Sequence, residues 1–264
     1  MSTLALATAT EGAMRIILVH GTGHGGWCWY RVATLLSAAG HRVDALDLAA
    51  SGIDSRQLRD VPTFEDYTRP LLDALRALLP GERAVLVGHS FGGMNIALAA
   101  EMFPEKVAAA VFVTALLPDC TNPRSHVVEN VRVTVQDRMD SVMDEEYIPP
   151  SSVFLGPEFL RQKLYQLSPP EDYTLSQSLV RVSSFYLPDL HSQPPFSESR
   201  YGAVRKVYVV CKHDQAIPEE YQHTMIAGCP VAEVREIADA DHMAMLSTPA
   251  ELAGHLAHVA NKYA

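Results

Sequence analysis

The sequence has few cysteines, a minority of basic residues and no long apolar run. Only four of its 264 residues are cysteines, and they are scattered without the spacing of a metal site or a disulfide framework. The longest purely apolar run, Val107–Val113, is far shorter than the roughly 20 residues that a membrane-spanning helix needs. Acidic residues outnumber basic ones by 31 to 21, so the chain would repel a nucleic-acid backbone. We therefore expect no metal, no nucleic-acid partner and no membrane partner.

What the sequence does contain is typical of a globular protein. Hydrophobic residues make up 48% of it and charged residues 20%, which excludes a disordered chain and predicts a sizeable core. Residues 1–12 are rich in Ser, Thr and Ala with Glu11 as the single charged side chain, and we expect them to form a flexible tail. A plastid transit peptide is the alternative, although such peptides are usually longer and carry arginine. We expect a cytoplasmic protein.

From Met14 onward, short apolar runs alternate with amphipathic stretches of helical length. This alternation predicts a mostly parallel sheet with helices on both of its faces. The expected strands are Arg15–His20, Arg42–Leu46, Ala84–Gly88, Val107–Thr114, Lys206–Cys211 and Val231–Ile237. The expected helices are Gly26–Ala39, Phe64–Leu79, Ser90–Phe103, Glu219–Ala227 and Ser247–Lys262.

One region, residues 118–200, interrupts the alternation. It holds 10 of the 17 prolines but only one of the 15 glycines, Gly156, although tight strand-to-helix turns favour glycine. Helical spacing of apolar residues recurs at 158–167 and again from Leu175 to Tyr186, and eight aromatic residues lie in the region. We predict a largely helical cap inserted between two parts of one core, 13–117 and 201–264. A helical subdomain without a ligand role is the alternative.

The sharpest motif is GHSFG at residues 88–92, between an apolar strand and a helix. This is the G-x-S-x-G nucleophile elbow in its strand–turn–helix context. The turn presents the hydroxyl of Ser90 above the sheet, and the helix behind it directs N–H groups and a positive dipole end toward developing negative charge. The pattern predicts Ser90 as a catalytic nucleophile.

A serine nucleophile needs a base and an orienting acid, which follow it in the order acid and then histidine. Asp214 comes directly after the strand at 206–211, and His242 follows the last strand. We predict the triad Ser90, Asp214 and His242. Asp241 precedes His242 directly, and neighbouring side chains usually point apart. His213 is followed by too few strands to be the base, and Asp239 is expected to be a solvated loop residue.

A glycine-rich loop, HGTGHGG at residues 20–26, follows the first strand. Gly21, Gly23 and Gly26 match G-x-G-x-x-G, and Asp44 or Asp47 would be the acidic residue of a dinucleotide-binding site. That alternative leaves the elbow and the Asp214–His242 pair unexplained. In a hydrolase the same loop supplies one N–H of an oxyanion hole, and the residue after the serine supplies the other.

Four segments together carry a specific resemblance: HGTGHGGW at 20–27, DALDLAASG at 44–52, GHSFGGMN at 88–95 and DHMAML at 241–246. In these segments, and from about Arg15 to Tyr263, the chain resembles the plant methylesterase and hydroxynitrile lyase family of α/β-hydrolases. The resemblance implies the α/β-hydrolase fold with a cap, and it implies a homodimer. The segment around 137–152 departs from the family's usual pattern.

The resemblance also assigns site residues. It implies that the N–H groups of Thr22 and Phe91 form the oxyanion hole. It places His24 beside the substrate pocket, where a loop-stabilising role is the alternative. The lyases of the family have threonine where this chain has Gly21, glutamate in place of His89 and lysine in place of Met243. All three residues match the esterases, and we expect Gly21, His24 and Met243 to lie at the pocket.

These observations predict a serine carboxylesterase that hydrolyses the methyl ester of a small hydrophobic acid and needs no cofactor. Aromatic, hormone-like and alkaloid acids all fit this description. A hydroxynitrile lyase using the same triad is one alternative, and without a lysine at Met243 the departing cyanide would lack a stabilising charge. A receptor that binds its ligand without turnover is another, because a complete triad does not by itself prove catalysis.

Overall fold

The computed structural model describes residues 13–134, 138–144 and 151–263. Its centre is a parallel sheet of six strands in the order β2-β1-β3-β4-β7-β8. The expected strands are all present, and their ends differ from the prediction by at most two residues. They are β1 (Arg15–Val19), β2 (Arg42–Leu46), β3 (Ala84–His89), β4 (Val107–Val113), β7 (Lys206–Cys211) and β8 (Glu233–Ile237).

Burial follows the position of each strand in the sheet. All residues of β3, β4 and β7 are buried, which accounts for their continuous apolar content. The edge strands β2 and β8 contain mostly exposed or partly buried residues and carry charged side chains. Charged edges discourage pairing with other chains. The sequence pattern thus distinguishes central from edge strands.

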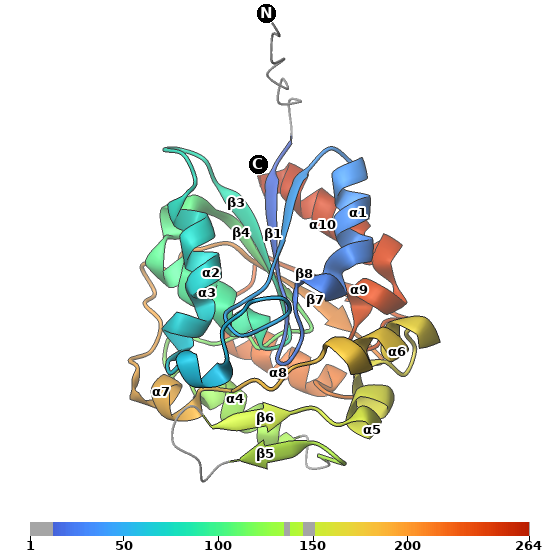
Figure 1. Cartoon of the computed structure of the whole chain (residues 1–264). Helices are drawn as coiled ribbons and strands as arrows, with labels where there is room; N and C mark the ends of the chain where they lie inside the picture. Colours follow the sequence, from blue (N-terminus) through green and yellow to red (C-terminus); the bar gives the residue numbers. More distant parts are fainter. Residues whose placement is uncertain (1–12, 135–137, 145–150, 264) are drawn as a thin grey trace, which may run out of the picture.

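Helices cover both faces of the sheet, as Figure 1 shows. On one face α2 and α3 pack against a core that also includes Met225 of α8. On the other face α1 packs against α10. The fold is the expected α/β-hydrolase fold. The bounds are α1 (Tyr30–Ala38), α2 (Phe64–Arg76), α3 (Gly92–Met102), α8 (Glu219–Gly228), α9 (Ala244–Ser247) and α10 (Pro249–Tyr263). Short 3₁₀ turns are η1 (Gly26–Trp29), η2 (Leu58–Asp60) and η3 (Pro104–Lys106).

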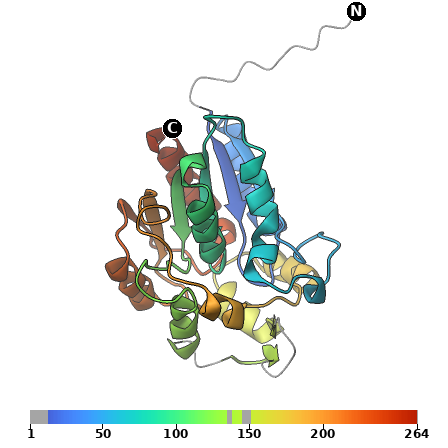
Figure 2. The same ribbon diagram turned by 90° about the vertical axis from the view of Figure 1, so that its left-hand side faces the viewer.

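The region expected to form a cap lies at the carboxyl ends of the strands, as Figures 1 and 2 show. Its described residues contribute no strand to the six-stranded sheet and instead form a separate two-stranded one. Tyr147, one of its eight aromatic residues, lies outside the described residues. The elements are α4 (His126–Thr134), β5 (Val142–Asp144), β6 (Ser152–Phe154), α5 (Pro157–Phe159), the π-helical turn η4 (Leu160–Leu164), α6 (Pro170–Leu179) and α7 (Leu187–Ser192).

The prediction of a helix from the apolar spacing of Leu175 through Tyr186 is wrong for the second half of that segment. Helix α6 ends at Leu179, and Leu175 is 44% exposed, so its apolar spacing does not mark the buried face. The chain leaves the helix because Arg181 binds the core: its N–H donates to the carbonyl of Gly23 (2.9 Å). Contacts distant in sequence therefore override the local pattern.

Candidate active site

The nucleophile elbow has the expected form. Strand β3 ends at His89, Ser90 has a φ of +54°, and α3 begins at Gly92. A Cβ atom on Gly88 would lie 2.6 Å from the carbonyl oxygen of Gly92. A Cβ atom on Gly92 would lie 2.7 Å from the carbonyl oxygen of His20. Both glycines are therefore required by close backbone approach, and the neighbouring strands hold Ser90 in a conformation unusual for a residue with a side chain.

The predicted acid and base meet in a buried hydrogen bond. Asp214 follows β7 and His242 follows β8, and Nδ1 of His242 lies 2.6 Å from Oδ2 of Asp214. The exposed fractions are 2% for Asp214 and 3% for His242. Because a carboxylate only accepts hydrogen bonds, His242 donates through Nδ1. Its Nε2 then has a free lone pair and can accept a proton.

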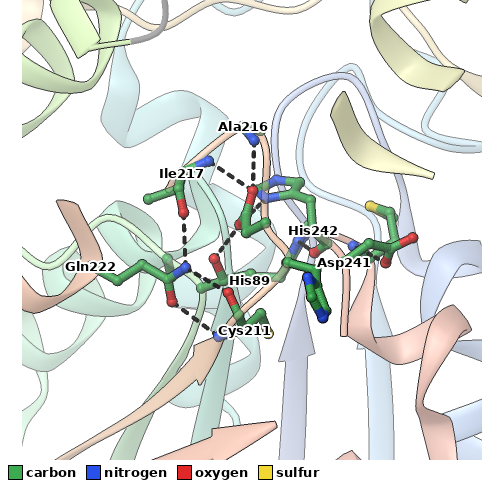
Figure 3. Close-up of polar contacts among 12 residues, drawn as sticks. His89, Cys211, Ala216, Ile217, Gln222, Asp241 and His242 are labelled. Carbon is green, nitrogen blue, oxygen red and sulfur yellow. Dashed lines mark hydrogen bonds and ion pairs between the residues drawn. The ribbon is translucent and has the colours of Figure 1, made fainter. Parts of the chain in front are cut away.

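Backbone groups hold the other oxygen of the carboxylate (Figure 3). Oδ1 of Asp214 accepts from the N–H groups of Ala216 (2.6 Å) and Ile217 (2.8 Å). The buried amide of Gln222 secures this loop, because it donates to the carbonyls of Cys211 and Ile217 and accepts from the N–H of Cys211. Gln222 has no counterpart in the sequence prediction, since a glutamine within a helix gives no signal of such a role.

A cavity of about 800 Å³, including its mouth, lies between the sheet and the cap. The wall formed by the sheet loops carries the polar side chains of Thr22, His24, His89, Ser90 and His242, and it contains most of the predicted site residues. The wall formed by the cap is mainly apolar. The lining residues are Gly21, Thr22, His24, His89, Ser90, Phe91, Leu116, Val131, Arg138, Ser141, Met143, Leu155, Phe159, Leu164, Phe185, Ala216, Ile217 and His242.

The structure places Ser90 and His242 on the same cavity wall, with Asp214 behind His242. Met243 differs from the expectation. It is fully buried in the core on the α1 and α10 face, and it does not line the cavity. Its N–H donates to Oδ1 of Asp241 (2.9 Å) at the start of α9, which turns its side chain into the core. Proximity in sequence to His242 therefore did not imply proximity to the cavity.

The predicted oxyanion-hole residues, Thr22 and Phe91, both line the cavity beside Ser90. Within the described part of the chain, no backbone hydrogen bond uses the N–H of either residue as donor. Gly21 is needed here for its size, since a Cβ atom would lie 2.7 Å from Cβ and 3.2 Å from Oγ of Ser90. A side chain at residue 21 would therefore crowd the serine hydroxyl.

Three further histidines near the site are buried. Burial lowers the pKa of His20 and that of His24 to about 4, and it lowers the pKa of His89 well below its ordinary value. Nδ1 of His24 lies 3.0 Å from the carbonyl oxygen of Thr22, and its Nε2 lies 2.7 Å from the hydroxyl of Tyr165. His24 therefore lines the cavity, and its ring also contacts the backbone of its own loop.

His89 contacts the predicted base directly. Its Nε2 lies 2.8 Å from the carbonyl oxygen of His242, and the two ring centroids are 4.6 Å apart. The nearby His242 is the second cause, after burial, of the lowered pKa of His89. A neutral His89 donates through Nε2 and fixes the backbone of His242 without adding a second positive charge beside it.

The other acidic and histidine residues near the predicted triad in the sequence lie elsewhere in the structure. Asp241 points away from His242 and accepts from the N–H of Leu167 and the hydroxyl of Ser168, both at 2.9 Å. Burial raises its pKa. Asp239 and His213 are exposed. These placements agree with the sequence argument against all three.

The acidic residues of the dinucleotide alternative are engaged within the protein. Asp47 accepts from the N–H of Gly26 at 2.7 Å, and Asp44 pairs with Arg15 at 2.7 Å. Both carboxylates thus have partners within the protein. In the described ranges no group of three or more His, Cys, Asp or Glu residues could hold a metal ion, and no helix is long and apolar enough to cross a membrane.

A serine on a strand-to-helix elbow, beside an aspartate–histidine pair at the carboxyl edge of a parallel sheet, defines the α/β-hydrolase class. The model of the alpha/beta hydrolase family matches residues 16–255, and the chain belongs to this family.

Individual relatives indicate which kind of α/β-hydrolase the chain is. Salicylic acid-binding protein 2 of Nicotiana tabacum is 47% identical over 254 residues, which cover 94% of this chain and 97% of the relative. Methylesterase 7 of Arabidopsis thaliana is 47% identical over 253 residues, covering 95% and 97%. The crystal structure of polyneuridine aldehyde esterase gives a TM-score of 0.91 at 38% identity, covering 94% of this chain and 99% of that one. With such relatives over nearly its full length, the chain is an ester hydrolase.

Proposed function

We propose that this protein is a serine carboxylesterase that hydrolyses the methyl ester of a small hydrophobic acid through an acyl-enzyme. One observation carries the proposal: Asp214 holds Nδ1 of His242 at 2.6 Å, while His242 and Ser90 line the same cavity. The choice of methyl esters rests on similarity to proteins named methylesterases. The apolar cap wall fits a hydrophobic acyl group.

In the first half-reaction, Nε2 of His242 takes the proton of the Ser90 hydroxyl as the oxygen attacks the ester carbonyl. The N–H groups of Thr22 and Phe91 stabilise the negative charge on the tetrahedral intermediate, and each such donor contributes on the order of 10²–10³ in rate. Asp214 stabilises the imidazolium that forms. His242 then protonates the departing methoxy oxygen, and methanol leaves while the acyl group stays on Ser90.

In the second half-reaction, His242 takes a proton from a water molecule as its oxygen attacks the acyl carbon. The tetrahedral intermediate collapses when His242 returns the proton to Oγ of Ser90, and the carboxylic acid leaves. Bonds and protons balance without any cofactor.

The two walls of the cavity have different roles in the proposed reaction. The polar wall holds the carbonyl that reacts, and the cap wall, with Leu155, Phe159, Leu164 and Phe185, faces the acyl group. Such a wall favours aromatic, hormone-like or alkaloid acids over highly charged ones.

The test is a panel of methyl esters with aromatic and aliphatic acyl groups, with products identified by mass spectrometry. We expect multiple turnovers on at least one ester, and a loss of several orders of magnitude in kcat for Ser90→Ala with binding nearly unchanged. Activity retained by Ser90→Ala would overturn the proposal. Cleavage of a cyanohydrin in preference to every ester would favour the lyase, and tight binding without turnover would favour the receptor.

A further inference from the structure

Thr114 has an unusual backbone conformation next to the site. It follows the last residue of β4, its side chain is completely buried, and its φ is +36°. This region of φ is unfavourable for any residue with a side chain and most unfavourable for one branched at Cβ. Strained backbone of this kind persists only where the surrounding structure imposes it, and it gathers at functional sites.

The contacts of Thr114 lead to the acid of the triad. Its N–H donates to the carbonyl of Val209 on the neighbouring strand β7 (2.9 Å), which fixes its backbone. Its hydroxyl donates to Oδ2 of Asp214. The same Oδ2 accepts the hydrogen bond from Nδ1 of His242. The left-handed backbone is thus what directs this hydroxyl at the carboxylate.

The same turn also holds the nucleophile. Ser90 donates its N–H to the carbonyl of Val113 (3.4 Å), and its own carbonyl accepts from the N–H of Leu116 (3.0 Å). Thr114 therefore lies between two hydrogen bonds to the elbow, directly after β4, the strand between β3 and β7. One short turn connects the backbone of Ser90 to the side chain of Asp214.

We propose that Thr114 is a positioning residue of the esterase, whose hydroxyl orients the Asp214 carboxylate and shares its Oδ2 with His242. The inference rests on the proposed function, because it assigns Thr114 a role through the triad. With Thr114, the carboxylate accepts four hydrogen bonds, two at Oδ1 from Ala216 and Ile217 and two at Oδ2. All its lone-pair directions are then used, and it cannot rotate away from the imidazole.

Three substitutions at Thr114 distinguish the effect of its hydroxyl from the effect of its backbone conformation. Thr114→Val keeps the branched shape and removes the hydroxyl, and Thr114→Ser keeps the hydroxyl and removes the branch. Thr114→Gly removes both and suits the left-handed backbone. The measurements are kcat and KM on one methyl ester, together with the folded fraction from near-ultraviolet circular dichroism. Ser90→Ala serves as the control for the proposed function.

We expect Thr114→Val and Thr114→Gly to lower kcat about tenfold with KM within about twofold, as befits one lost hydrogen bond to a charged group. Thr114→Ser keeps the wild-type kcat. If the valine and glycine variants fold and keep the wild-type kcat while Ser90→Ala is inactive, the inference about Thr114 fails and the proposed function stands. If Ser90→Ala is active, the proposed function fails.

Discussion

The two walls of the cavity are held in place by different forces. On the sheet side, His24, His89 and His242 each make hydrogen bonds that set the direction of the ring. On the cap side, the lining is mainly apolar, and Phe185 is placed by packing its ring against Phe91 at a centroid distance of 5.6 Å. Directional hydrogen bonds therefore fix the histidine rings on the sheet side, while packing, which tolerates substitution, sets the shape of the cap wall.

Away from the cavity, hydrogen bonds connect the cap to the core. Asp172 of α6 accepts from the hydroxyl of Tyr30 and from Nη2 of Arg31, both at 2.9 Å. The guanidinium of Arg181 donates to three backbone carbonyls of the loop at 52–56. The cap is thus anchored at its edges by polar contacts, and its surface facing the cavity is mainly apolar.

The largest expected effect comes from breaking a directional bond, with Asp214→Asn. Its Oδ1 can still accept from Ala216 and Ile217, so the amide NH₂ would face Nδ1 of His242. Nδ1 must then accept, which places the proton on Nε2 and removes the base. We expect kcat to fall about 10⁴-fold, measured on the best methyl ester.

Folding of the Asp214→Asn variant is checked by thermal unfolding beside the wild type. If this variant folds correctly and keeps more than about a tenth of wild-type kcat, the role assigned to the carboxylate is contradicted.

On the cap wall, Phe185→Ala should have a smaller effect of a different kind. Losing one phenyl contact with the acyl group should raise KM about tenfold, with kcat within about twofold. Phe154→Ala is the matched control, because Phe154 is a cap phenylalanine that does not line the cavity. Steady-state kinetics on an aromatic methyl ester gives both constants. A fall in kcat at constant KM would show that this wall positions the reacting groups.

The smallest effect concerns stability and pH. His20 and His24 have a pKa of about 4 when folded against 6.5 otherwise, so the unfolded chain binds more protons between these values. The contribution of these two neutral histidines to the free energy of unfolding is fully present above about pH 6.5. It is lost as the pH falls toward 4, by up to about 1.4 kcal/mol per pH unit for each histidine. Denaturant unfolding from pH 7.5 to 4.5 measures this slope.

Replacing His24 by glutamine should reduce that slope relative to the wild type. Equal slopes in the wild type and the His24 variant would show that His24 does not stay neutral in the folded protein.

The sheet and the acid–base pair could be predicted from sequence because their signals are local. Buried parallel strands are continuous apolar runs, and the carboxyl ends of neighbouring strands meet at one edge, so Ser90, Asp214 and His242 were expected at one place. Gly88 and Gly92 mark the elbow because only glycine allows the backbone to approach so closely.

The features that the sequence did not predict depend on contacts between segments that are distant in the sequence. The apolar spacing around Leu175 suggested a longer helix, but Arg181 binds the loop at 52–56 and draws the chain away. Met243 was expected at the cavity, yet the start of α9 turns it into the core. Thr114 was expected only as the end of a strand, because the left-handed turn that aims its hydroxyl at Asp214 has no signature in a threonine.

The central claim is that the hydroxyl of Ser90 carries the acyl group during turnover. Acid quenching during the steady state, followed by peptide mass spectrometry, tests it directly. We predict that the peptide containing Ser90 gains the mass of the acyl group, and that the gain disappears in Ser90→Ala. An acyl group on another residue, or turnover of the ester by Ser90→Ala, would contradict the account.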